Sequence, residues 1–223
     1  MGIGVVVFLL LTMVCLGLIY VVHRYFGKEQ FYLLGIIYSI LSFVLSFKLI
    51  NILGVDINAN IIFSSGLLML LYYFVNRYNE KESRRFIFTI ISVTLICICF
   101  LIVTSVMVPS IYDKMSIFYQ NMIFSNLPII ILYPISLCIS LFLGEYCFKE
   151  LKKEENKKNI KLIPIIFGII FIDVAVFIYF SYAFIIKFNT AINIAIDNYL
   201  VKVCIMIVYT LIVNKLFMVR KVK

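Results

Sequence analysis

Long apolar runs alternate with short polar connections along the whole chain. Seven runs are candidate membrane spans: residues 3–22, 31–50, 57–75, 86–108, 122–148, 162–186 and 198–218. A helix that rises about 1.5 Å per residue needs roughly 20 residues to cross about 30 Å of hydrocarbon, and the runs approach or exceed this length. The pattern predicts an all-α integral membrane protein, a compact bundle of six or seven transmembrane helices in which residues 1–223 form a single polytopic domain.

The third run has the weakest pattern. Its uninterrupted apolar core is limited to Ile61–Val75, so it spans only if Asn58 and Asn60 enter the membrane edge. Seven spans are favoured, and six spans with a re-entrant third segment stay open as the alternative.

Composition supports lipid as the solvent of this chain. Of its residues, 64% are hydrophobic and 14% are charged, and the mean hydropathy is +1.12. A soluble fold could not hide so much apolar surface from water, whereas hydrocarbon accepts it. The six cysteines all lie inside apolar runs and are interpreted as small membrane-core residues, without a metal site or a disulfide framework.

The basic residues indicate the orientation of the spans. Lys and Arg in successive connections number two, zero, four, one, six and one, and the C-terminal tail has three. Cytoplasmic connections are richer in Lys and Arg, so this alternation predicts an N-terminus outside and a C-terminus in the cytoplasm, in the cell (plasma) membrane. It also explains the net charge of +9 better than nucleic-acid binding does.

Ionisable residues inside a span are costly and therefore mark candidate sites. Asp173 lies eleven residues into the run 162–186, close to the predicted midplane. It is interpreted as a contact to substrate or coupling ion, or else as a protonated acid bonded to a neighbouring helix. Lys202 is predicted about 6 Å below the outer surface, and Lys48 near the outer end of the second span. The two lysines either snorkel outward or join Asp173 in a cavity open to the outside.

Other polar and helix-bending residues complete the candidate site. Pro128 and Pro134 should bend the run 122–148, as a cavity wall or as a packing kink. Asn51 and Asn58 suit turns, and a place on the rim of an outward cavity is the alternative. Tyr72 suits the interfacial belt or helix packing and is also retained as a candidate substrate contact.

Catalytic patterns are not found in the sequence. The chain has one histidine and shows no nucleophile elbow, no phosphate-cradling glycine loop and no set of metal ligands. We therefore expect no enzyme, no cofactor and no bound metal. Without an ATP-binding motif, transport would draw on an ion gradient or on a separate energising ATPase module.

Several short motifs occur in a recognisable order: RYFGK at Arg24–Lys28, FKLINILG at Phe47–Gly54, NRYNEKESRR at Asn76–Arg85, Leu127–Pro128 in the proline-bearing run, Glu145 before a basic connection, and FIDVAVF at Phe171–Phe177. Together they resemble the queuosine-precursor transporter family, also called vitamin-uptake-like transporters. The last looks like the family's Q-L-I-D-T-x-x-F signature, with Asp173 as its aspartate. Order and spacing agree over roughly residues 20–215.

The departures from the family pattern fall where a purine-like ligand would need hydrogen bonds. Leu71 and Tyr72 replace a Thr-Asp pair, Asn76 and Asn79 replace an acidic residue and a glycine, Ile129 replaces an arginine, and Leu162–Ile170 replaces a polar run. Because buried polar partners give most of the discrimination between ligands, these changes affect the substrate more than the fold. The resemblance implies a divergent member.

The resemblance implies uptake of a small water-soluble compound, of the queuosine-precursor, purine-like or vitamin-like class. The family is similar to the substrate-binding subunits of energy-coupling-factor vitamin transporters. Asp173 would provide the key polar contact, with positive potential from Lys48 and Lys202. The rival expectation is a membrane-embedded accessory or structural subunit that does not transport and whose substrate site has decayed. The expected partners are the lipid bilayer and a small-molecule substrate, with no nucleic acid.

Overall fold

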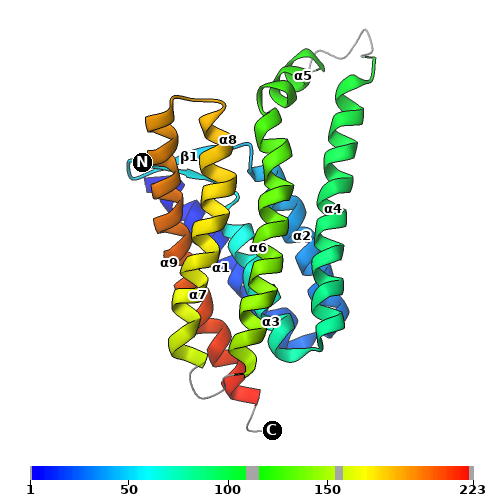
Figure 1. The fold of residues 1–223 in the computed structure, drawn as a ribbon, viewed down its shortest axis with the longest axis vertical. Helices are drawn as coiled ribbons and strands as arrows, with labels where there is room; N and C mark the ends of the chain where they lie inside the picture. Colours follow the sequence, from blue (N-terminus) through cyan, green and yellow to red (C-terminus); the bar gives the residue numbers. More distant parts are fainter. Residues whose placement is uncertain (1, 109–115, 154–157, 221–223) are drawn as a thin grey trace.

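The computed structural model of the chain describes residues 2–108, 116–153 and 158–220, which fold into a helical bundle with one β-hairpin (Figure 1). In chain order the elements are α1 (Gly2–Tyr25), α2 (Lys28–Leu45), β1 (Leu49–Ile52), β2 (Val55–Asn58), α3 (Ile61–Arg77), α4 (Glu80–Val106), α5 (Ser116–Ser125), α6 (Leu127–Lys153), α7 (Lys158–Val174), η2 (Ala175–Tyr179), α8 (Phe180–Ala183) and α9 (Phe188–Arg220). The prediction of an all-α membrane bundle is confirmed.

Six helical stretches within the described residues are long and apolar enough to cross a membrane. They are Gly4–Tyr25, Lys28–Leu45, Glu80–Val106, Leu127–Lys153, Leu162–Ala183 and Phe188–Val213. The apolar helix α3, with 17 residues, is shorter than these six.

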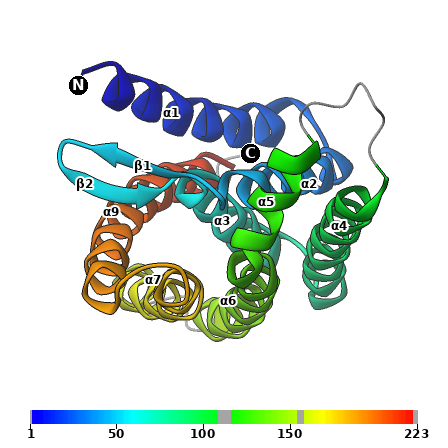
Figure 2. The same cartoon turned by 90° about the horizontal axis from the view of Figure 1, so that it is seen from above.

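Helix α3 lies near the centre of the bundle and packs against α1, α2, α4, α6 and α9 (Figure 2). Every residue of Ile61–Val75 except Ser64 is buried. A helix that is apolar on all sides is typical of a protein interior, because it has no face for water. Helix α3 is therefore a core helix enclosed by the other helices. Close contact is part of this packing, since a Cβ atom on Gly66 would come within 2.7 Å of the Tyr38 ring.

Successive long helices run in opposite directions, and α1 begins at the end of the bundle opposite to the end of α9 (Figure 1). The basic end comprises the α1–α2 turn, the α3–α4 turn and the C-terminal part of α6; ion pairs from Lys28 to Glu82 and from Lys149 to Glu80 connect these parts. The hairpin end comprises β1, β2 and the start of α9. This arrangement fits an odd number of passes, with α3 counted as one.

The hairpin corrects the predicted bounds of the second and third spans. Helix α2 ends at Leu45 rather than at residue 50, and α3 begins at Ile61 rather than at residue 57. Between them β1 and β2 pair antiparallel around a two-residue turn, in which Leu53 (φ 57°) and Gly54 (φ 86°) both have positive φ. Such a turn matches the twist of paired strands. The apolar residues of β1 extended the hydropathic run of α2, because a short apolar run alone does not distinguish strand from helix.

The later spans also begin at different residues from those predicted. The run 122–148 divides at Asn126, so Pro128 is the second residue of α6, where a missing N–H costs little, and it does not bend the middle of a helix. Pro134 does lie inside α6. Helix α9 starts at Phe188, ten residues before the predicted start at 198. Two polar residues at the predicted boundary, Asp197 and Asn198, accept hydrogen bonds from backbone N–H groups of the hairpin.

Candidate functional site

Asp173 lies in the middle of the span Leu162–Ala183 and binds side chains from two other helices, α6 and α9. Its Oδ2 atom pairs with the Lys202 ammonium of α9. Its Oδ1 atom accepts hydrogen bonds from the Ser136 and Ser140 hydroxyls of α6, at 2.6 Å and 2.7 Å. The Lys202 ammonium also donates to the Ser64 hydroxyl of α3 at 2.9 Å. We call these five residues the polar cluster.

Lys202 lies much deeper in the bundle than the sequence predicted. Because α9 begins at Phe188, Lys202 is fourteen residues along the helix, about 21 Å from its start. Only 4% of its side chain remains accessible, compared with 14% for Asp173. Snorkelling to the outer surface, one of the two predicted fates of this lysine, is therefore wrong: its charge is neutralised inside the bundle.

The polar cluster is electrically neutral and well hydrogen-bonded. Moving a single charge into a medium of low dielectric costs several kcal/mol, and an ion pair offsets this cost only when additional hydrogen bonds satisfy the remaining donors and lone pairs. Three hydroxyls do so here. Asp173 and Lys202 thus depend on each other, and a change to either leaves the other charged in a nearly dry environment.

Two backbone irregularities flank the polar cluster. On α7, the π-helical segment η2 begins two residues after Asp173. On α6, Pro134 precedes Ser136 by two residues and cannot donate to the carbonyl of Ile130. Single π-helical turns are frequent at functional sites, and irregular backbone at membrane depth is tolerated where it is buried or lines a cavity. The helices that bear the carboxylate and its two serine donors are thus both locally irregular.

Asn58 joins the hairpin to the surrounding helices through hydrogen bonds to Ser46, Tyr182 and Asn198. Its backbone N–H donates to Asn198 Oδ1 at 2.8 Å, and its side-chain amide donates to the Ser46 carbonyl at 2.7 Å and to the Tyr182 hydroxyl at 2.8 Å. Asn198 lies one helical turn before Lys202 on α9, so the hairpin is joined to the helix that provides the lysine. Asn58 is buried, and its observed role is this joint.

The remaining predicted residues lie elsewhere. Lys48 and Asn51 line a cavity beside the hairpin, and none of that cavity's lining residues belongs to the polar cluster. Tyr72 is buried on α3, and its ring packs against Phe148 with centroids 5.1 Å apart. It is eight residues beyond Ser64, about 12 Å further along α3 toward the basic end. Of the six predicted substrate contacts, two meet in the polar cluster.

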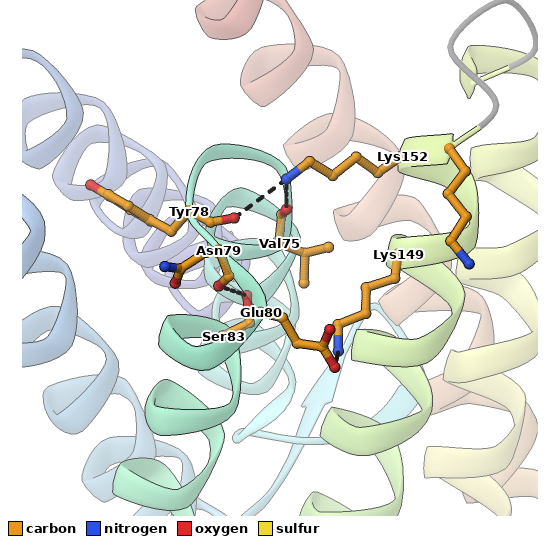
Figure 3. A pocket seen from close by; sticks show the side chains of 8 residues that line it. Val75, Tyr78, Asn79, Glu80, Ser83, Lys149 and Lys152 are labelled. Atoms are coloured by element: carbon orange, nitrogen blue, oxygen red, sulfur yellow. Dashed lines mark hydrogen bonds and ion pairs between the residues drawn. The ribbon is translucent and has the colours of Figure 1, made fainter.

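A second cavity, of about 370 Å³, opens at the basic end (Figure 3). Figure 3 shows Lys149 and Lys152 reaching from α6 toward the α3–α4 turn. Lys152 donates to the Val75 carbonyl at 2.7 Å and to the Tyr78 carbonyl at 3.3 Å, and Lys149 is 2.8 Å from Glu80. These two lysines hold the turn against α6. Their bonds explain the structure of the cavity without a ligand.

The three serines of the polar cluster were not predicted. Ser136 and Ser140 are four residues apart, so they share one face of a helix, and they follow a proline closely. That spacing was a usable signal within an apolar run. Ser64 had no such signal, because only folding brings it to Lys202. Within the described residues, no group of three or more His, Cys, Asp or Glu side chains is suited to hold a metal ion.

Comparisons with known proteins add no further constraint: no family model matches the chain, and no curated protein or solved structure matches it significantly. The geometry of the polar cluster therefore carries the functional argument.

Proposed function

We propose that this membrane protein takes up a small water-soluble compound and that the polar cluster recognises it. The observation that carries the proposal is the Asp173–Lys202 pair, held between four helices in the middle of two spans. Ionisable residues at this depth are rare, because hydrocarbon penalises them strongly, and they typically mark substrate or ion pathways.

The pair can exchange partners while each charged group keeps a hydrogen bond. A ligand with amine or amide donors can take the place of the Lys202 ammonium on Asp173, and an anionic group of the ligand can take the place of Asp173 on Lys202. A purine-like compound has donors and acceptors that suit this exchange, which agrees with the resemblance to queuosine-precursor transporters. A ligand shifts a conformational equilibrium only by its difference in affinity between two states, and partner exchange would provide that difference.

The irregular backbone near the pair favours movement of two helices: α7, which bears Asp173, and α6, which bears its two serine donors. Helix α7 changes to π-helical geometry after Asp173, and α6 lacks one backbone hydrogen bond near Ser136. Small rearrangements at such points cost less than bending a regular helix. In the proposed orientation, the hairpin end faces outward and the basic end faces the cytoplasm. An ion gradient or a separate ATPase module would supply the energy.

Uptake by the purified protein tests this proposal. Proteoliposomes would be offered radiolabelled deazapurine precursors and vitamins, with wild-type protein compared with D173N/K202M, which keeps the shapes of both side chains and removes both charges. We expect uptake by wild type and its loss in the double variant. E150Q, which neutralises an exposed carboxylate of α6, is the control and should transport normally.

Folding and function must be separated in the same samples. If D173N/K202M does not fold, ligand-induced thermal stabilisation of the wild-type protein provides a second measurement, since a ligand that binds the native state raises its melting temperature. Undiminished uptake by a folded D173N/K202M would remove the polar cluster from the proposal.

An accessory or structural subunit is the second candidate function. It is favoured by the apolar residues 162–170 and by the mutual satisfaction of Asp173 and Lys202, since a staple between helices needs no ligand. Absence of uptake and of thermal stabilisation for every compound tested would support this function and contradict transport.

A further inference from the structure

The cavity beside the hairpin has an apolar interior and a single charged residue. Its volume is about 430 Å³, within the range of small-molecule sites. It lies between the start of α1, the end of α2, strand β1 and the start of α3. The lining residues are Gly4, Val7, Phe8, Leu11, Leu45, Lys48, Ile50, Asn51, Ile52, Ala59, Ile62 and Phe63.

Lys48 is the only charged residue in this lining, and it is exposed. In the part of the chain that the structure describes, no carboxylate forms an ion pair with its ammonium. The other polar lining residue is already engaged within the hairpin: the Asn51 amide donates to Asp56 at 2.6 Å, and its oxygen accepts from the Gly54 N–H at 3.1 Å. The cavity therefore presents one uncommitted cation beside an apolar wall.

The cavity lies at the edge of the membrane-spanning region. Gly4 is the third residue of α1, which is a candidate span, so this part of the helix is near a membrane surface. The neighbouring surface is apolar: Leu10 on α1 is 59% exposed, and Leu53 at the hairpin tip is 67% exposed. An apolar side chain at a strand turn suits contact with lipid rather than with water. The occupant is therefore to be sought in the bilayer itself.

We propose that this cavity binds an anionic phospholipid of the surrounding bilayer, with one acyl chain against α1 and the phosphate on Lys48. The charges are complementary, and lysines at a membrane surface attract anionic head groups. The apolar wall accepts the acyl chain because removing apolar surface from water is favourable. The site is separate from the polar cluster, so it stands whether or not the protein is a transporter.

Fluorescence quenching tests the proposal directly, because the chain contains no tryptophan. F8W would place one tryptophan in the cavity, and L10W would place one at a similar depth on the exposed face of α1. Each protein would be reconstituted with phosphatidylglycerol or phosphatidylcholine brominated on the acyl chains. We expect phosphatidylglycerol to quench the F8W signal more strongly, and both lipids to quench L10W equally. Equal quenching of F8W by the two lipids would overturn the proposal.

Paired variants separate the phosphate contact from the chain contact. K48A in the F8W background should reduce the preference for phosphatidylglycerol about fivefold. K187A, which removes an exposed lysine between α8 and α9, should leave it unchanged. G4L should fill the cavity, since a Cβ on Gly4 meets open space, whereas G17L on the same helix is the control.

Retained native lipid gives a readout without tryptophan. Native mass spectrometry of the wild-type protein should detect bound anionic phospholipid, and G4L should lose it while G17L keeps it. Unchanged lipid retention in both K48A and G4L would contradict the site.

Discussion

Ion pairs of similar chemistry are found in two different surroundings in this molecule. At the centre, Asp173 and Lys202 keep 14% and 4% of their side-chain surface. At the basic end, Glu80 and Lys149 keep 57% and 24%, and Arg84 and Lys28 form further pairs there. Solvent and salt screen an exposed pair, so it contributes little to stability. A central pair has no such screening, and each charge depends on its partner.

The difference shows what each region does for the protein. The basic end joins helices through several replaceable contacts, since Lys149 contacts both Glu80 and Glu145. The polar cluster has one cation and one anion, with hydroxyls that cannot replace either. Loss of one charged residue should therefore lower the free energy of unfolding slightly at the basic end and strongly at the centre. Four variants test this comparison, from the largest expected effect to the smallest.

Removal of Lys202 alone should give the largest effect. K202M leaves the Asp173 carboxylate enclosed without its cation, and breaking a buried pair in this way costs about 3–5 kcal/mol. Unfolding of the detergent-solubilised protein by denaturant, followed by circular dichroism, would measure the loss. K149M is the matched control and should cost clearly less. Equal losses in the two variants would contradict the comparison.

Removal of both central charges should restore part of that stability. In D173N/K202M no charge is left unpaired, so the double variant should be more stable than the less stable of its two parents. The double-mutant cycle with D173N and K202M should give a coupling free energy of roughly 1–3 kcal/mol. Strict additivity would mean that Asp173 and Lys202 do not interact.

Lys152 should have an intermediate effect. Its ammonium caps the carbonyls of Val75 and Tyr78 near the C-terminus of α3, where a cation is favourable. K152M should lower the free energy of unfolding by roughly 0.3–1 kcal/mol. The same denaturant titration would detect this change. A loss as large as that of K202M would show that this cap contributes as much to stability as the central pair and would contradict the comparison.

Glu80 should have the smallest effect. E80Q removes a carboxylate that is accessible to solvent, and its neighbours Arg84 and Lys149 both retain access to Glu145. Thermal melting at low and at high sodium chloride should give the same midpoint as wild type within error. A marked, salt-dependent drop in the melting midpoint would show that Glu80 contributes substantially to stability at the basic end.

The sequence predicted the membrane bundle and the depth of Asp173 well, because both depend on hydropathy along one segment. The span 162–186 was placed closely enough to put Asp173 at its centre. Lys202 was misplaced because the polar start of α9 resembled a connection. In the folded protein, the hairpin N–H groups of Asp56 and Asn58 bond to Asp197 and Asn198 within α9, a contact that the sequence does not reveal.

Two other features depend on tertiary structure and could not be read from the chain. Ser64 meets Lys202 across 138 residues of sequence, and no local pattern encodes that contact. The enclosure of α3, an apolar helix shorter than the six candidate spans, is also known only from the folded bundle. The apolar residues of β1 and β2 looked like helix ends, because each strand has only four residues, too few for a strand period to be recognised.

The central pair has a consequence for biogenesis. A lone Asp or Lys at the middle of a helix costs roughly 2.5–3.5 kcal/mol during insertion from the translocon. Asp173 and Lys202 are on consecutive long helical segments that are joined by a short turn at residues 184–187. If these segments enter the lipid together as one helical hairpin, they bring a neutral pair instead of two separate charges. Because a short connection joins the segments that bear these two charges, α7 to α9 should insert as a unit.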